Sequence, residues 1–235
     1  MSVAAEAVVD AWDRLVALAE QIGPDDWQRP TPCPDSDVAG LVAHVAGPGA
    51  WQPAAAGAAG DPVEALRGTR ATQVGQIAAV GGDASHPTED GRGERMLRAS
   101  CADLWVHTYD LTTGLGEDFD LDENSATLAQ ACQYLLGLTP ALVASRLAPG
   151  EAADLRVALR GGVEHDRTLA VRNSQARWDG SARAGSEQLV AATPAAFVLL
   201  LSGRGDPGQL RNSGVLEWCG AHGEAFVRRA RLYCC

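Results

Sequence analysis

Aromatic residues are scarce in this chain, which narrows the fold classes it can adopt. They make up 5% of the 235 residues, whereas hydrophobic residues of all kinds make up 46%. Alanine and leucine dominate the hydrophobic set, and both favour helices over an aromatic-rich β-sandwich. A chain of this length can form one large domain or two small ones. We therefore expect a mainly helical protein with a substantial core.

Basic residues are also few. The combined count of lysine and arginine is 19, against 30 for aspartate and glutamate, and the formal net charge is −11. A nucleic-acid-binding domain needs a concentrated basic surface, and binding to anionic membrane surfaces relies on the same positive charge. We therefore expect neither nucleic acid nor a membrane as a partner.

A long apolar run is missing as well. The longest apolar stretch, residues 189–201, is interrupted by Thr193 and Pro194 and is too short to cross a bilayer. The first residues contain no basic segment followed by an apolar run, which a secretion signal requires. These features predict a cytoplasmic protein.

Several motifs of common enzymes are absent. The sequence contains no G-x-S-x-G, no Walker loop and no G-x-G-x-x-G, which argues against serine-hydrolase, nucleotide and dinucleotide chemistry. The cysteines form no C-x-x-C pair, so in a reducing compartment we expect most of them to be free thiols. They are Cys33, Cys101, Cys132, Cys219, Cys234 and Cys235.

Hydrophobic periodicity divides the chain into two parts. A period near 3.6 predicts helices over residues 3–21, 37–46, 62–80, 94–114 and 124–147. After about residue 149, runs with period 2 at 155–160 and 168–172 predict strands, and helices are expected at 194–201 and 216–231. We therefore predict a helical domain over residues 1–148 and a smaller α+β domain over residues 149–235.

The helix predicted at 94–114 carries a polar stripe on an otherwise apolar segment. Asp103 and His107 are four residues apart, so on a helix they share one face. A carboxylate and an imidazole in a helical core are costly to bury unless they are paired or bind a metal. Together they can supply two ligands to a divalent metal, and His44 on another predicted helix is the best third candidate. A surface Asp–His pair, and a buried core histidine at position 44, are the alternatives.

Three motifs together resemble the mycothiol-dependent maleylpyruvate isomerase family, which belongs to the DinB-like group of metal-binding four-helix bundles. They are Arg-Pro-Thr-Pro-Cys-Pro at 29–34, Leu-Val-Ala-His-Val-Ala-Gly at 41–47 and Val-His-Thr-Tyr-Asp-Leu at 106–111. Residues 195–204 and the expected C-terminal strands and helix are also similar to that family. The resemblance implies a divalent metal, usually zinc, held by His44, Asp103 and His107 with one position open. It also implies mycothiol, the small thiol of actinobacteria, as cosubstrate.

Two departures from the family pattern bear on the reaction. The family usually has glutamate where this chain has Asp103, and Gly-Trp where it has Asp35-Ser36. We therefore expect an S-transferase that transfers or exchanges the thiol on an electrophilic metabolite or natural-product intermediate. The alternatives are a cis–trans isomerase of the maleylpyruvate type, a hydrolase with Asp110 or Asp103 as base, and a non-catalytic metal- or ligand-binding protein.

Two arginines are candidates for binding an anionic substrate or the thiol cosubstrate. Arg204 and Arg211 lie in the predicted C-terminal domain, and a guanidinium group pairs well with carboxylates and other oxyanions. Ordinary surface arginines are the alternative interpretation. The expected partners are thus a small-molecule thiol and an electrophilic small molecule, in a monomer or a homodimer.

Overall fold

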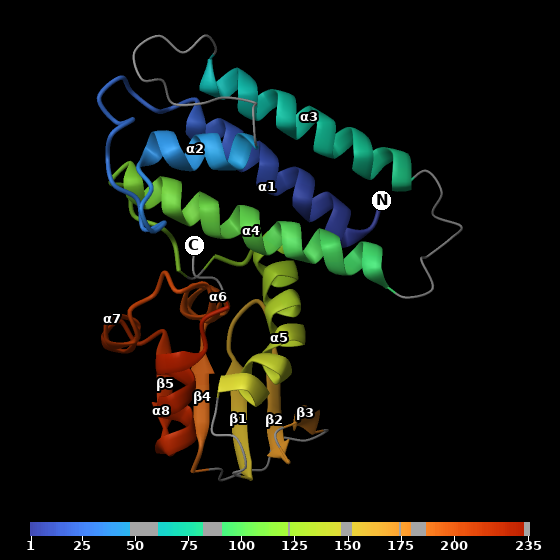
Figure 1. Ribbon diagram of the computed structural model, residues 1–235, viewed down its shortest axis with the longest axis vertical. Helices are drawn as coiled ribbons and strands as arrows, with labels where there is room; N and C mark the ends of the chain where they lie inside the picture. The colour runs from blue at the N-terminus through green and yellow to red at the C-terminus, as the bar shows by residue number, and fades with distance from the viewer. Residues whose placement is uncertain are drawn as a thin grey trace. The chain divides into compact units, whose positions relative to one another are not determined.

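The computed structural model describes residues 1–47, 61–81, 91–121, 123–146, 152–173, 175–179 and 187–232. These residues form two compact units, Met1–Phe119 and Asp120–Cys234 (Figure 1). The first is helical and the second combines helices with a sheet, which confirms the predicted fold class. In the described ranges, no helix is long and apolar enough to cross a membrane. Cys234 and Cys235 lie outside the described residues.

The N-terminal unit contains the four helices that the periodicity predicts. They are α1 (Val3–Ala19), α2 (Val38–Ala46), α3 (Pro62–Gly81) and α4 (Arg92–Gly114). Helix α1 packs against α3 and α4, and α2 packs against the same two helices. Every helix therefore takes part in a single bundle core.

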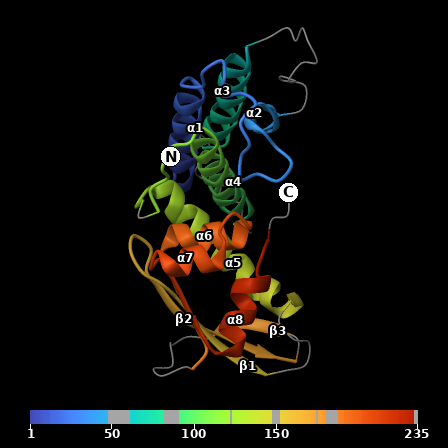
Figure 2. The same cartoon turned by 90° about the vertical axis from the view of Figure 1, so that its left-hand side faces the viewer.

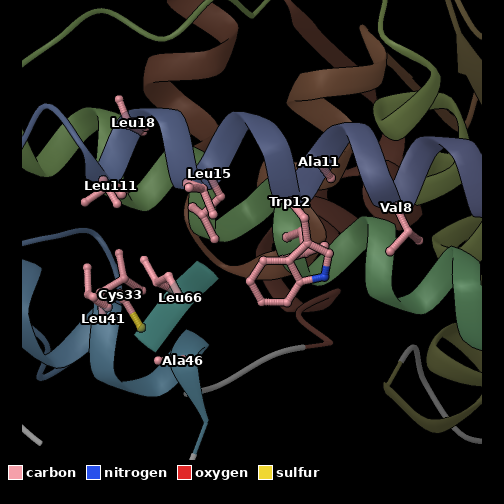
Figure 3. Packing of buried hydrophobic residues seen from close by; sticks show 14 of the residues in the cluster. Val8, Ala11, Trp12, Leu15, Leu18, Cys33, Leu41, Ala46, Leu66 and Leu111 are labelled. Carbon is pink, nitrogen blue, oxygen red and sulfur yellow. The ribbon is translucent and has the colours of Figure 1, made fainter. Parts of the chain in front are cut away.

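The bundle core is built from apolar residues of all four helices (Figure 3). Leu15 of α1, Leu41 of α2 and Leu66 of α3 are almost fully buried, and Leu111 of α4 packs into the same cluster. Full burial of one leucine side chain stabilises the fold by roughly 1.5–3 kcal/mol. This packing keeps α2 and α4 together, and these two helices carry His44, Asp103 and His107.

The C-terminal unit is built on a five-stranded sheet with the order β3-β2-β1-β4-β5. Strand β1 pairs antiparallel with β2 and parallel with β4, while the β2–β3 and β4–β5 pairs are antiparallel. The strands are β1 (Ala153–Leu159), β2 (His165–Arg172), β3 (Gln175–Asp179), β4 (Leu189–Ala192) and β5 (Leu216–Cys219).

The alternating runs of the sequence predict β1 and β2, whereas residues 216–219, which form β5, were predicted as part of a helix. In the structure the last long helix, α8 (Gly220–Arg229), begins only after β5. Trp218 lies opposite Val190 of β4, and Leu216 lies opposite Ala192. A four-residue segment is too short to show either period, so its pairing with a distant strand decides its conformation.

The remaining helices lie on one side of the sheet (Figure 2). They are α5 (Ala126–Arg146), α6 (Pro194–Ser202), the short α7 (Pro207–Asn212) and α8. Helix α6 is buried along its whole length, as expected for a helix that is hydrophobic on all sides. The other face of the sheet carries ion pairs, including Arg156–Asp166 and Arg172–Asp154.

The two units divide after Phe119, whereas the sequence places the domain boundary at residues 148/149. Helix α5 accounts for the difference, because it packs against α6, β2 and β3. The indole N–H of Trp178 on β3 donates a hydrogen bond of 3.1 Å to the carbonyl oxygen of Leu136. The apolar residues of α5 thus contribute to the core of the C-terminal unit.

Candidate metal centre

The segment before α2 fixes the start of that helix. Asp37 caps the helix, since its Oδ1 accepts a hydrogen bond of 2.7 Å from the Gly40 N–H. The Thr31 hydroxyl donates to the carbonyl oxygen of Ser36 at 2.8 Å, which closes the proline-rich loop on itself. Helix α4 ends against this loop, because a Cβ atom at Gly114 would lie only 2.9 Å from the Thr31 side chain. Glycine therefore allows the end of α4 to approach the start of α2.

Helix α4 presents Asp103, His107 and Asp110 from successive turns of one face. His107 is only 3% exposed and Asp110 is fully buried, whereas the Asp103 side chain is 59% exposed. Met96, at the far end of the same stripe, is 66% exposed. The polar stripe thus runs from solvent into the bundle.

The two ring nitrogens of His107 each face a carboxylate. Nε2 lies 3.5 Å from Oδ1 of Asp103, and Nδ1 lies 3.5 Å from Oδ2 of Asp110. The His44 ring from α2 meets the His107 ring edge to face, with the ring centroids 5.1 Å apart. His107 is therefore a neighbour of both His44 and Asp103, although the three residues come from two helices.

These carboxylates control the charge of His107. Burial of the ring opposes its charged form, but Asp103 and Asp110 outweigh burial and raise the pKa of His107 to about 9. In the protein without metal, His107 is therefore expected to carry a proton on both nitrogens at neutral pH. A metal ion at Nε2 would replace one of these protons.

The helical spacing of the sequence places Asp110 on the same face as His107, and Asp110 was also a candidate base, but its complete burial was not predicted. It lies behind His107, fully buried, where its carboxylate faces Nδ1. A histidine that binds a metal usually donates its other ring N–H to a carboxylate or a carbonyl oxygen. The spacing of three residues between His107 and Asp110 was the available signal, but their burial could not be read from it.

The distances around His107 fit two ligands of one zinc ion. At 3.5 Å, the Nε2–Asp103 separation is longer than a good hydrogen bond. Two ligand atoms at zinc bond lengths in a tetrahedral site lie about 3.3–3.4 Å apart. His44 is the third donor in reach, but within the described residues no three His, Cys, Asp or Glu side chains form a complete metal site. His44 is exposed, so its ring has room to turn toward such an ion.

Part of the helical unit matches a known protein family. Residues 8–90 match the family model of the mycothiol maleylpyruvate isomerase N-terminal domain. The match supports the family predicted from the motifs over this part of the chain. It includes α2 with His44 and ends before Asp103 and His107. No curated protein matches the chain.

The two arginines suggested for binding the family's thiol or its substrate lie in the C-terminal unit. Arg204 follows α6, and its Nη1 donates to the carbonyl oxygen of Ser202 at 3.2 Å. Arg211 lies on α7, and its guanidinium carbon is 4.4 Å from the centre of the Trp218 ring. Both arginines thus make contacts within their own unit, and their role in binding stays a prediction.

Proposed function

We propose that this protein is a metal-dependent enzyme that uses mycothiol as a nucleophile on an electrophilic small molecule. Its metal, zinc in this proposal, would be held by His44, Asp103 and His107. The observation that carries the proposal is the position of His107 between the exposed Asp103 and the buried Asp110. The family match supports both the thiol and the enzymatic character.

The protein's own residues orient the donors. Asp110 faces Nδ1 of His107 and favours a proton there, so that Nε2 is the nitrogen left for the metal. Nε2 faces Asp103, whose side chain is exposed, and His44 is exposed as well. Two of the three proposed donors are therefore open to an exogenous ligand, while the His107 ring is buried.

Zinc, when bound here, lowers the pKa of a thiol that coordinates it and supplies a nucleophile at neutral pH. In the favoured reaction, a carbon–sulfur bond forms at the electrophilic carbon, and the leaving group departs with its electron pair. Because the thiol stays attached, this reaction is an S-transfer. The departures at Asp103, Asp35 and Ser36 from the family pattern support this choice.

A cis–trans isomerisation of the maleylpyruvate type is the second candidate, favoured by the description of the matching family. There the thiol adds to a double bond conjugated to a carbonyl, the new single bond rotates, and the thiol leaves again. The thiol is regenerated in isomerisation and consumed in S-transfer. Measuring thiol consumption per product molecule therefore separates the two reactions.

The first experiment is metal analysis by elemental mass spectrometry on wild type, His107→Ala and His222→Ala. His222 lies on α8, so its substitution is a matched control outside the candidate centre. We expect about one zinc per chain in wild type and in His222→Ala, and its loss in His107→Ala. Wild-type protein without metal, after purification free of chelators, would contradict the proposal and favour a non-catalytic binding protein.

Thiol-dependent turnover is the second experiment. Zinc-loaded protein is incubated with electrophilic substrates, with and without mycothiol, and product and free thiol are followed by mass spectrometry. We expect turnover only with the thiol. Turnover that is equally fast without any thiol would indicate hydrolysis instead.

A further inference from the structure

Four arginines gather where α5 and α8 end. Arg146 is the last residue of α5, Arg228 and Arg229 form the last turn of α8, and Arg231 follows two residues later. Nη1 of Arg146 donates to the carbonyl oxygen of Arg229 at 3.3 Å, which joins the two helix ends. The four side chains line a surface hollow of about 530 Å³.

Among the residues that the structure describes, one carboxylate pairs with this cluster. Glu224 pairs with Arg228, with an Nη2–Oε1 distance of 2.9 Å. In the part of the chain that the structure describes, no carboxylate pairs with the other three arginines. The chain as a whole is strongly acidic, with a net charge of −11, so acidic groups to neutralise the cluster are abundant. Within the described ranges, three neighbouring arginines without a carboxylate partner therefore stand out in an acidic chain.

The helix dipole accounts for only part of this arrangement. A cation in the last turn of a helix is stabilised by the dipole by about 0.3–1 kcal/mol at most exposed sites. That effect explains a single basic residue at each helix end. It does not explain four guanidinium groups around one hollow, because like charges repel one another. A bound anion would remove this repulsion.

We infer that the arginine cluster, defined as Arg146, Arg228, Arg229 and Arg231, binds a small polyanionic molecule through its phosphate or carboxylate groups. The planar guanidinium group offers two parallel N–H donors that match the oxygens of both groups. The hollow is open to solvent and lined by these four arginines, which suits a small anion held through its oxygens. The four arginines belong to the C-terminal unit, whereas His44, Asp103 and His107 belong to the N-terminal unit.

Isothermal titration calorimetry with inorganic phosphate and with tricarballylate, a tricarboxylate, tests the inference. The test variant is Arg229→Gln/Arg231→Gln. The matched control is Arg160→Gln/Arg177→Gln, which removes the same charge from exposed positions on or beside the sheet. We expect at least one probe to bind wild type, with an affinity at least about tenfold weaker in the test variant. In the control variant the affinity should change less than about twofold.

The probe that wild type binds more tightly shows whether the site prefers phosphate or carboxylate groups. Equal weakening in both double variants would show general charge attraction and overturn the site. No binding of either probe at 10 mM in 50 mM salt, a condition with little screening, would also overturn it. His107→Ala is expected to bind the probes like wild type, so the outcome is independent of the metal centre. Should the test variant not fold, the single change Arg231→Gln gives the same comparison.

Discussion

Asp110→Asn tests most directly how His107 is held for a metal. Asp110 is fully buried, and its Oδ2 lies 3.5 Å from Nδ1 of His107. Asparagine has nearly the same volume, so the substitution removes the charge and leaves the packing almost unchanged. Carboxylates that support a metal-binding histidine typically contribute 10- to 100-fold to metal affinity. We therefore expect zinc affinity to fall by about that factor, which corresponds to roughly 1.4–2.7 kcal/mol.

The same substitution should change the protonation of His107. Burial of the ring lowers its pKa, and Asp103 and Asp110 together raise it to about 9. With Asp110 neutral, only Asp103 opposes the effect of burial, so the pKa of His107 in metal-free protein should fall well below 9. NMR titration of the imidazole signals measures this change directly.

Zinc affinity is measured by competition with a chromogenic chelator, together with the melting temperature of each variant. Asp10→Asn is the matched control, because it makes the same charge change at an exposed position on α1. We expect its zinc affinity to equal that of wild type. An unchanged zinc affinity in a well-folded Asp110→Asn variant would refute the proposed support of His107 by Asp110.

Three further predictions concern stability. In metal-free protein, the folded state binds the His107 proton more tightly than the unfolded state, whose pKa is 6.5. The resulting stabilisation of roughly 3 kcal/mol is fully present below pH 6.5 and is lost as the pH rises through about 9. Urea unfolding at several pH values measures this change in the free energy of unfolding. The His107→Gln variant should lack this pH dependence. Phe197→Ala, in the buried helix α6, should cost about 3–5 kcal/mol in urea unfolding, whereas the exposed Met96→Ala should change stability by less than about 0.5 kcal/mol. Asp37→Ala removes the N-cap of α2 and should lower the free energy of unfolding by about 1 kcal/mol in the same assay. Asp37→Asn should retain most of the cap and lose less stability. Equal losses of stability in both variants would contradict the capping role.

The sequence predicts an element correctly where its hydrophobic pattern repeats over several residues within that one segment. Three helices of the N-terminal unit, α1, α2 and α4, show an apolar stripe over two or more turns, whereas α3 has a weakly apolar face and was predicted from the proline that opens it. The structure contains all four close to the expected positions. Strands β1 and β2 were visible for the same reason, through alternation over several residues. The pairing of Asp103 with His107 on one helix face also follows from local geometry alone.

Prediction failed where distant parts of the chain decide the local structure. Residues 216–219 form a strand because they pair with β4, and α5 belongs to the C-terminal unit because its apolar face packs on the sheet and on α6. Neither partner can be read from the segment itself. Four residues are too few for a period, and an apolar helix face does not specify the surface that covers it.

The sequence by itself indicated the family resemblance and determined the helical bundle and the face of α4 that carries Asp103 and His107, because helical periodicity and contiguous motifs are local properties of the chain. Only the tertiary structure decided that Asp110 is buried behind His107, and that His44 from α2 lies beside that ring. The arginine cluster likewise exists only after α5 and α8 have packed. Burial and proximity between distant segments depend on how all the apolar faces pack together, which no single segment encodes.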